Sequence, residues 1–206
     1  MRDKKIWIFN AGNAFDGNPK WLFMYIVNYR KDITPYWFCY TEETRNYIRK
    51  LGYQAFLFKS KMAEKIGSQA GVYVVNQKKE VFQDYLKGIT VLNLWHGVGC
   101  KTVEKGVTYG FLNERIIKKH IINMDCYQNY QLFLVTSPLM EKHFIKQCDL
   151  AEDKIIRAGY PCCFYPGKIK TYDHDILKQK KLPEDTKIAV YAPTYRDASA
   201  TNFFSQ

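Results

Sequence analysis

The sequence predicts an α/β fold, with a mostly parallel sheet and flanking helices. Short apolar runs rich in aromatic and β-branched residues recur along the chain, and helix-like stretches lie between them. This alternation is typical of successive βα units. A chain of 206 residues with 47% hydrophobic and 16% aromatic residues is long and apolar enough to fill a core. These values argue against an intrinsically disordered protein.

Eight apolar runs are predicted to be strands. Each is short and is followed by polar or turn-forming residues, as expected for strands buried in a parallel sheet. The predicted strands are Lys5–Phe9, Tyr36–Tyr40, Ala55–Phe58, Val72–Val75, Val91–Trp95, Leu132–Val135, Ile155–Ala158 and Lys187–Ala192.

Two proline-containing pairs predict the starts of helices. Asn18-Pro19 combines a capping side chain with a proline at the first helical position, where the missing N–H costs nothing. The segment Trp21–Tyr29 continues this helix, and because it is apolar nearly all round we expect it to be buried. Ser137-Pro138 gives the same signal before Leu139–Gln147.

A polar segment near the end of the chain predicts a domain boundary. Gly167–Asp185 is rich in lysine, and Leu182-Pro183 leads from it into the last predicted strand. We expect one domain over residues 1–185 and the start of a second, truncated domain over residues 186–206, which are too few to form a domain themselves.

The chain is strongly basic and carries no membrane-spanning run. Thirty-one Lys and Arg against 20 Asp and Glu give a net charge of +11 and a pI of about 9.3, which favours anionic partners such as phospholipid or phosphate-rich polymers. Nucleic acid is not expected, because no motif of the common nucleic-acid-binding folds is present. The longest apolar run, Trp21–Val27, is far shorter than the roughly 18 residues that span a bilayer. No apolar signal-peptide core follows Met1–Lys5, so a cytoplasmic protein is expected.

The cysteine pattern predicts no metal site. None of the six cysteines forms a C-x-x-C pair, and the spacing of Cys162-Cys163 is wrong for a usual zinc or redox site. We interpret all six as reduced thiols, which agrees with a cytoplasmic location.

Polar residues follow most of the predicted strands and are therefore expected at one edge of the sheet, where open α/β folds bind ligands. They are Asn10–Asn18 with Gly12 and Gly17, Thr41, Ser60, Asn76, His96-Gly97, Ser137, Tyr160-Pro161 and Thr194–Arg196.

The most specific of these segments is Leu94–Lys101, in which a strand ends directly at His96. Histidine is suited to proton abstraction near neutral pH. Gly97 and Gly99 allow close backbone approach to an anion, and Lys101 adds positive charge beside a phosphate. An equally weighted alternative is that His96 is a hydrogen-bonded residue beside an ordinary glycine turn.

The remaining candidates are weaker. Thr194 and Arg196 supply the hydroxyl and guanidinium that bind a phosphate, although the same residues could form an ordinary surface turn. The other three histidines are expected to be solvated. They are His120, His143 and His174.

Four motifs, in order and spacing, resemble the CDP-glycerol glycerophosphotransferase family of teichoic-acid and capsule polymer enzymes. The resemblance runs from about Gly12 to Asp197. The motifs are Gly17-Asn18-Pro19-Lys20, Trp95-His96-Gly97 with Lys101, Gly159-Tyr160-Pro161 and Pro193-Thr194-Tyr195-Arg196-Asp197.

The resemblance implies a GT-B architecture of two Rossmann-like domains, of which this chain supplies the N-terminal, acceptor-side one. His96 matches the family's catalytic histidine. It would deprotonate the terminal hydroxyl of a lipid-linked or polymeric acceptor at the inner face of the cell membrane, with CDP-glycerol as the donor. Substrate-binding roles follow for Asn18, Gly97, Gly99, Lys101, Ser137, Tyr160, Thr194 and Arg196. No separate cofactor is firmly implied.

The chain departs from the family in two places, and these leave alternatives open. Val98-Gly99-Cys100 follows His-Gly where the family usually has Thr-Pro-Leu, and Cys162-Cys163-Phe164 replaces Arg-Asn-Asp. The donor could therefore be CDP-ribitol or another polyol or sugar phosphate. The family's second histidine and its Thr-Asp-Tyr-Ser-Ser-like segment have no match, so the chain alone is expected to be inactive. Half of a nucleotide-sugar glycosyltransferase and a non-catalytic basic module that binds membrane or nucleic acid are the rival functions.

Overall fold

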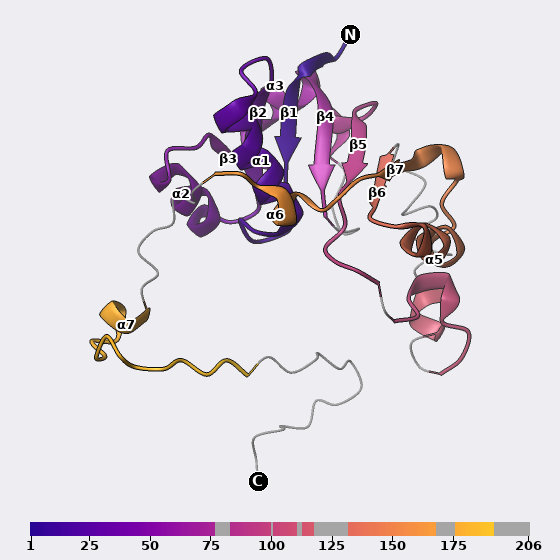
Figure 1. Ribbon diagram of the computed structural model, residues 1–206. Coiled ribbons are helices and arrows are strands. Elements are labelled where there is room, and N and C mark those ends of the chain that lie inside the picture. Colours follow the sequence, from indigo (N-terminus) through magenta and orange to yellow (C-terminus); the bar gives the residue numbers. More distant parts are fainter. Residues whose placement is uncertain (77–82, 100, 111–112, 118–131, 168–175, 192–206) are drawn as a thin grey trace. The chain divides into compact units, whose positions relative to one another are not determined.

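A computed structural model describes residues 1–76, 83–99, 101–110, 113–117, 132–167 and 176–191 (Figure 1). The chain divides into two units, Met1–Lys170 and Thr171–Gln206. The first contains the sheet and all of the candidate site that is described. Within the described part of the second, the regular element is the short helix α7, Ile176–Gln179.

The first unit is built on a seven-stranded sheet in the order β3-β2-β1-β4-β5-β6-β7, and every neighbouring pair of strands is parallel. The strands are β1 (Asp3–Phe9), β2 (Thr34–Cys39), β3 (Ala55–Leu57), β4 (Ala70–Val75), β5 (Thr90–Asn93), β6 (Leu132–Val135) and β7 (Ile155–Arg157).

All but the last of the helices in this unit connect successive strands of the sheet. The helices are α1 (Gly17–Tyr29), α2 (Glu42–Lys50), α3 (Lys61–Gln69), α5 (Pro138–Cys148) and α6 (Pro161–Phe164), with single 3₁₀ turns η1 (Asp84–Leu86), η2 (Glu104–Gly106) and η3 (Glu152–Lys154). Among the described residues, no helix is both long and apolar enough to cross a membrane.

Helices α1 and α5 cover opposite faces of the sheet. Phe23 of α1 meets Phe9 of β1 edge to face, at 5.4 Å between ring centroids. The residue pairings of β1 with β4, β4 with β5 and β5 with β6 show that Phe9 and Leu132 face the same side of the sheet. Phe133 is the next residue on β6, so it faces the other way, and it packs on Phe144 of α5. The core is thus split into two apolar layers around one sheet.

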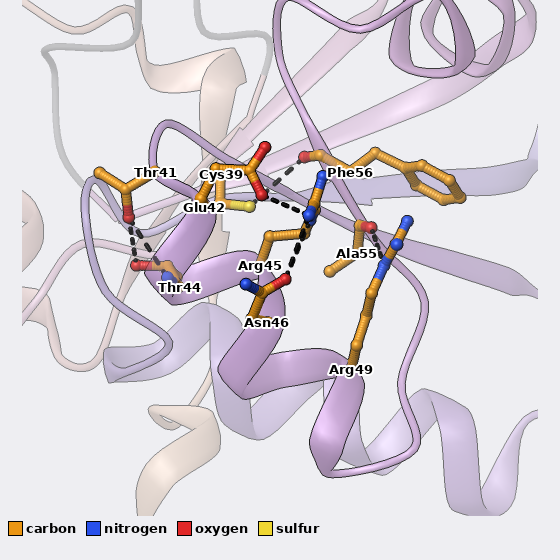
Figure 2. Close-up of polar contacts among 9 residues, drawn as sticks. All are labelled: Cys39, Thr41, Glu42, Thr44, Arg45, Asn46, Arg49, Ala55 and Phe56. Atoms are coloured by element: carbon orange, nitrogen blue, oxygen red, sulfur yellow. Dashed lines mark hydrogen bonds and ion pairs between the residues drawn. The ribbon is translucent and has the colours of Figure 1, made fainter.

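Helix α2 is attached to the edge strand β3 by side-chain contacts (Figure 2). Its first turn is capped by the Thr41 hydroxyl, which accepts a hydrogen bond from the backbone N–H of Thr44. Near its end, Arg49 donates to the carbonyl oxygen of Ala55 at 3.0 Å and lies over the ring of Phe56. These contacts hold the short strand β3, which pairs with β2 alone among the described strands.

The predicted α/β, Rossmann-like fold class is confirmed, and seven of the eight predicted strands are present with boundaries that differ by at most two residues. The predicted strand Lys187–Ala192 is wrong over its described residues, because 187–191 form no strand. A strand needs a neighbour to bond with, and the described part of the second unit provides none. The predicted helix start at Ser137 is confirmed, since its hydroxyl accepts from the Met140 N–H at 3.2 Å.

The strand order places a topological switch point at the carboxyl ends of β1 and β4. From β1 the chain proceeds to β2 on one side, whereas β4 begins the series that runs the other way. The connections at such a switch point leave in opposite directions, and the space between them is where open α/β folds bind ligands. In Figure 1 the arrowheads of β1, β4 and β5 point toward this edge, where α6 lies beside α1.

Candidate functional site

Buried asparagines mark the carboxyl edge of the sheet. Among the described residues, the buried polar side chains are Asn10, Asn18, Asn76 and Asn93. Asn10 follows β1, Asn76 follows β4, and Asn93 is the last residue of β5. Buried amide side chains normally form hydrogen bonds, and three of these four hold loops in place through such bonds.

A tight turn after β5 places His96 at the carboxyl edge of the sheet. The side-chain oxygen of Asn93 accepts a hydrogen bond from the Trp95 N–H at 2.8 Å, and Trp95 has a left-handed backbone with φ of 55°. The indole of Trp95 is buried and stacks on the imidazole at 4.3 Å between centroids. His96 itself is exposed, so it can meet a substrate.

The backbone of β4 orients the His96 ring. Nδ1 of His96 lies 3.1 Å from the carbonyl oxygen of Asn76. A carbonyl oxygen can only accept, so in the neutral imidazole Nδ1 carries the proton and Nε2 keeps its lone pair. The ring is therefore held in the tautomer that can take a proton at Nε2.

Asn18 joins α1 to the His96 turn. It does not cap the helix as predicted, because α1 begins at Gly17 and no side-chain cap is present. Its Nδ2 instead donates to the carbonyl oxygens of Trp95, at 3.0 Å, and Leu94, at 3.4 Å. Its Oδ1 accepts from the N–H of Cys162 at 3.4 Å. Since Asn18 is 3% exposed, its side chain positions the loop.

The segment Tyr160–Tyr165, here called the return segment, leaves β7 and packs against α1. The Tyr160 hydroxyl donates to the carbonyl oxygen of Gly97 at 2.6 Å, and burial raises the pKa of this phenol. At its other end, Tyr165 packs against Trp21 and its hydroxyl accepts from Asn28. The return segment thus clamps the His96 turn through the carbonyl oxygen of Gly97.

Helix α5 supports the loop beyond His96. A Cβ on Gly99 would lie 2.7 Å from Nε2 of His143, so a larger residue here would displace the imidazole. Gln147 contacts Nδ1 of His143 at 3.0 Å, and its side-chain oxygen accepts from the Val103 N–H. The expectation that His143 is solvated is wrong, because its Nε2 is buried where this face of α5 packs on the loop.

The structure brings five of the predicted residues together. His96, Gly97 and Gly99 lie on one loop, which Asn18 and Tyr160 contact or clamp. Ser137 caps α5, and Lys101 is exposed. Thr194 and Arg196 lie outside the described residues, as do His120 and His174.

Sequence reasoning named Asn76 only as a loop residue and did not single it out. The signal was an asparagine directly after a buried strand, but its importance depends on β4 being the neighbour of both β1 and β5. No group of three or more His, Cys, Asp or Glu side chains that could hold a metal ion occurs in the described part of the chain.

Comparisons with known proteins agree with this architecture. Residues 1–206 match the family model described as CDP-Glycerol:Poly(glycerophosphate) glycerophosphotransferase. None of the curated proteins compared with the chain matches it. Among solved structures, the wall teichoic acid polymerase TagF is similar with a TM-score of 0.70 and 20% identity over 95% of this chain and 49% of that chain. A histidine-to-alanine variant of TagF gives a TM-score of 0.71 and 20% identity over 98% and 50% of the two chains.

At this identity the structural likeness shows the fold alone, and the chain spans about half the length of the TagF chains it matches. The family model covers the whole sequence, from the first residue to the last. The chain therefore belongs to the CDP-glycerol:poly(glycerophosphate) glycerophosphotransferase family.

Proposed function

We propose that this chain forms the acceptor-side part of an enzyme that transfers glycerol phosphate, or a related polyol phosphate, from a CDP-polyol to a polyol-phosphate acceptor. The observation that carries the proposal is the contact of 3.1 Å between Nδ1 of His96 and the Asn76 carbonyl oxygen, which prepares Nε2 as a general base. Family membership gives the reaction class.

In the proposed reaction His96 acts on the acceptor. Its Nε2 takes the proton from the terminal hydroxyl of the acceptor while that oxygen attacks the β-phosphorus of CDP-glycerol. The bond from this phosphorus to the bridging oxygen breaks, and CMP leaves with the bonding electrons. Nδ1 keeps its proton and continues to donate it in a hydrogen bond to the Asn76 carbonyl oxygen. This bond stabilises the imidazolium as it forms.

The reaction also depends on positioning. Phosphoryl transfer depends mainly on holding the two reactants in line and on neutralising phosphate charge. Asn18 and Tyr160 supply the first requirement indirectly, because their hydrogen bonds fix the backbone on either side of His96. We assign the second requirement to exposed Lys101 and to Thr194 and Arg196, as donor-phosphate ligands.

We further propose the setting of the reaction. Residues 1–185 would form the acceptor domain and residues 186–206 the start of a donor domain, in a GT-B enzyme. The acceptor would be lipid-linked or polymeric, and the protein would bind the anionic cytoplasmic face of the membrane through its net charge of +11. Teichoic acid or capsule polymer would be the product.

The test uses the full-length protein, purified poly(glycerol phosphate) acceptor and CDP-glycerol, with CMP release as the measurement. CMP release that depends on added acceptor supports the proposal. Turnover of a nucleotide sugar in place of CDP-glycerol would instead identify a glycosyltransferase. No turnover of any nucleotide donor, with binding to anionic vesicles, would favour a non-catalytic basic module.

A further inference from the structure

Two cysteine side chains lie together on the surface of the return segment. Cys162 and Cys163, in α6 (Pro161–Phe164), are both free and exposed, and their Sγ atoms are 3.8 Å apart. The other described free cysteines, Cys39 and Cys148, are buried. An exposed thiol with a second thiol in contact can be oxidised to a disulfide. Among the described cysteines, this pair is therefore the one placed to react with an oxidant.

The backbone of the pair is joined to both residues that hold the His96 turn. The N–H of Cys162 donates to Oδ1 of Asn18 at 3.4 Å, and the N–H of Cys163 donates to the carbonyl oxygen of Tyr160 at 2.9 Å. The side chains of Asn18 and Tyr160 in turn bond the backbone on either side of His96. A change of the backbone at the two cysteines would therefore reach this turn by two routes.

Neighbouring cysteines can form a disulfide only if the backbone between them changes. The Cα atoms of neighbouring residues are about 3.8 Å apart across a trans peptide, which is below the roughly 4.4 to 6.8 Å that disulfides usually span. The two Sγ atoms would also have to approach from 3.8 Å to about 2.05 Å. Closing the bond would therefore reshape α6, and the resulting strain would make the disulfide easy to reduce.

We propose that Cys162 and Cys163 form a redox-sensitive modification site, at which a small-molecule disulfide converts the pair reversibly into an internal disulfide that loosens the His96 turn. The Sγ of Cys163 attacks the small-molecule disulfide, which releases one small thiol and leaves a mixed disulfide. The Sγ of Cys162 then attacks the Cys163 sulfur, and a second small thiol leaves. The pair gives up two electrons and two protons, and the small-molecule disulfide takes them up as it becomes two thiols.

The order of the two attacks follows from the surroundings of Cys162. Burial raises the pKa of its thiol, and the neighbouring Cys163 raises it further, so Cys162 is slow to attack an external disulfide. Its attack on the mixed disulfide is intramolecular, and the short distance between the two Sγ atoms offsets its low reactivity. The conversion should become faster as the pH rises, because the thiolate is the attacking form.

Oxidation is expected to loosen the His96 turn because it disturbs the contacts of the pair with Asn18 and Tyr160. Each hydrogen bond contributes modestly, so we expect amide hydrogen exchange over residues 94–99 to become about 5- to 10-fold faster. Transfer activity should fall by a similar factor. The effect on activity rests on the proposed function, whereas the modification and the exchange rates do not.

The experiment exposes the full-length protein to excess oxidised glutathione, alkylates the remaining free thiols and digests with trypsin. Cleavage after Arg157 and Lys168 gives the peptide 158–168, which contains Cys162 and Cys163 and no other cysteine. This peptide should carry neither an alkyl group nor glutathione, and its mass should be lower than that of the dithiol form by two hydrogen atoms. A mild dithiol reductant should restore the reduced peptide, the slower exchange and the rate of CMP release.

Cys163→Ser is the matched control, because it removes the attacking thiol by the exchange of one atom. In the same oxidant this variant should keep a free Cys162 thiol and its rate of CMP release, whereas oxidation elsewhere in the chain would affect both proteins. Equal losses of activity in the variant and the wild type would overturn the inference. A wild-type peptide 158–168 that stays reduced, or that retains glutathione, would do the same.

If the reduced wild type releases no CMP at all, the proposed function fails, and the peptide mass and the exchange rates then decide. An internal disulfide that speeds exchange over residues 94–99 in the wild type, with no change in Cys163→Ser, supports the modification site. An internal disulfide that leaves the exchange unchanged refutes its coupling to the His96 turn.

Discussion

The imidazole of His96 is hydrogen-bonded through Nδ1 to the backbone carbonyl oxygen of Asn76, at 3.1 Å, across the ends of two neighbouring strands. If the partner of Nδ1 were a side chain, a mutation could remove it. A backbone carbonyl oxygen is present whatever the residue, and the sheet holds it in place. The orientation of the proposed base is thus a direct product of the pairing of β4 with β5.

The hydroxyl of Tyr160 should be needed for activity more than for folding. Tyr160→Phe removes the 2.6 Å bond to the Gly97 carbonyl oxygen, so we expect a lower kcat with little change in KM and a loss of about 1 kcal/mol in unfolding free energy. Tyr165→Phe removes a similar bond at the exposed end of the return segment and should leave kcat unchanged. Equal effects of the two variants on kcat would contradict the clamp.

Gly17→Ala should harm the site through a direct clash. The new Cβ would meet Nδ2 of Asn76 at 2.8 Å, in addition to the strain of a φ of 61°. Gly52→Ala is the matched control, since Gly52 has a φ of 85° but nothing within 4 Å of a Cβ. Both should lose about 1 kcal/mol in stability from backbone strain, and only Gly17→Ala should also lower transfer activity, measured by CMP release.

Arg2 should contribute strongly to stability, because it ties the start of β1 to three other segments. Its guanidinium donates to four backbone carbonyl oxygens at 2.6 to 2.8 Å, those of Gly67, Ala70, Tyr85 and Lys87. Arg2→Leu leaves these acceptors unpaired and should cost about 2–4 kcal/mol in urea denaturation.

The control for Arg2 is Arg30→Leu, which removes a bidentate contact to the neighbouring Asp32. This pair is exposed on both sides, so its loss should change stability very little. Comparable losses in the two variants would show that the four carbonyl contacts of Arg2 stabilise the fold no more than an exposed ion pair does.

Stability should fall in strong alkali. Burial raises the pKa of Cys39 to about 11 and that of Tyr85 to about 12, from ordinary values of 9.0 and 10.0. Both groups ionise first in the unfolded chain, so their contribution is complete below pH 9 and is lost as the pH rises to about 12. Tyr85→Phe should flatten the decrease of unfolding free energy between pH 10 and 12, and Tyr29→Phe at an exposed site should not.

Local sequence patterns predicted the sheet well because each strand is a compact apolar run. Phe9, Val75 and Val135 each end such a run, and polar residues follow at once. The last predicted strand, Lys187–Ala192, has the same local pattern but no neighbouring strand in the described part of its unit. Composition reports how well a segment suits a strand, whereas strand formation also requires a hydrogen-bonded neighbour.

The roles within the site were harder to predict because they depend on distant partners. Asn18 looked like a helix cap, yet its side chain bonds residues 77 and 144 positions away. Tyr160 looked like a ligand-binding residue, yet its hydroxyl is bonded to the carbonyl oxygen of Gly97. His96 was identified because its signal, a histidine at the end of a buried strand followed by glycines, is local.

The most direct test of the account is the rate of CMP release from CDP-glycerol by the full-length protein with wild-type His96 and with His96→Ala. The loss of a positioned general base should lower this rate about 10²- to 10⁴-fold without changing the thermal stability, since His96 is exposed. Val98→Ala, at a 64% exposed position on the same loop, should remain close to the wild-type rate. Activity of His96→Ala within a few-fold of wild type, at normal stability, would contradict the assignment of His96 as the base.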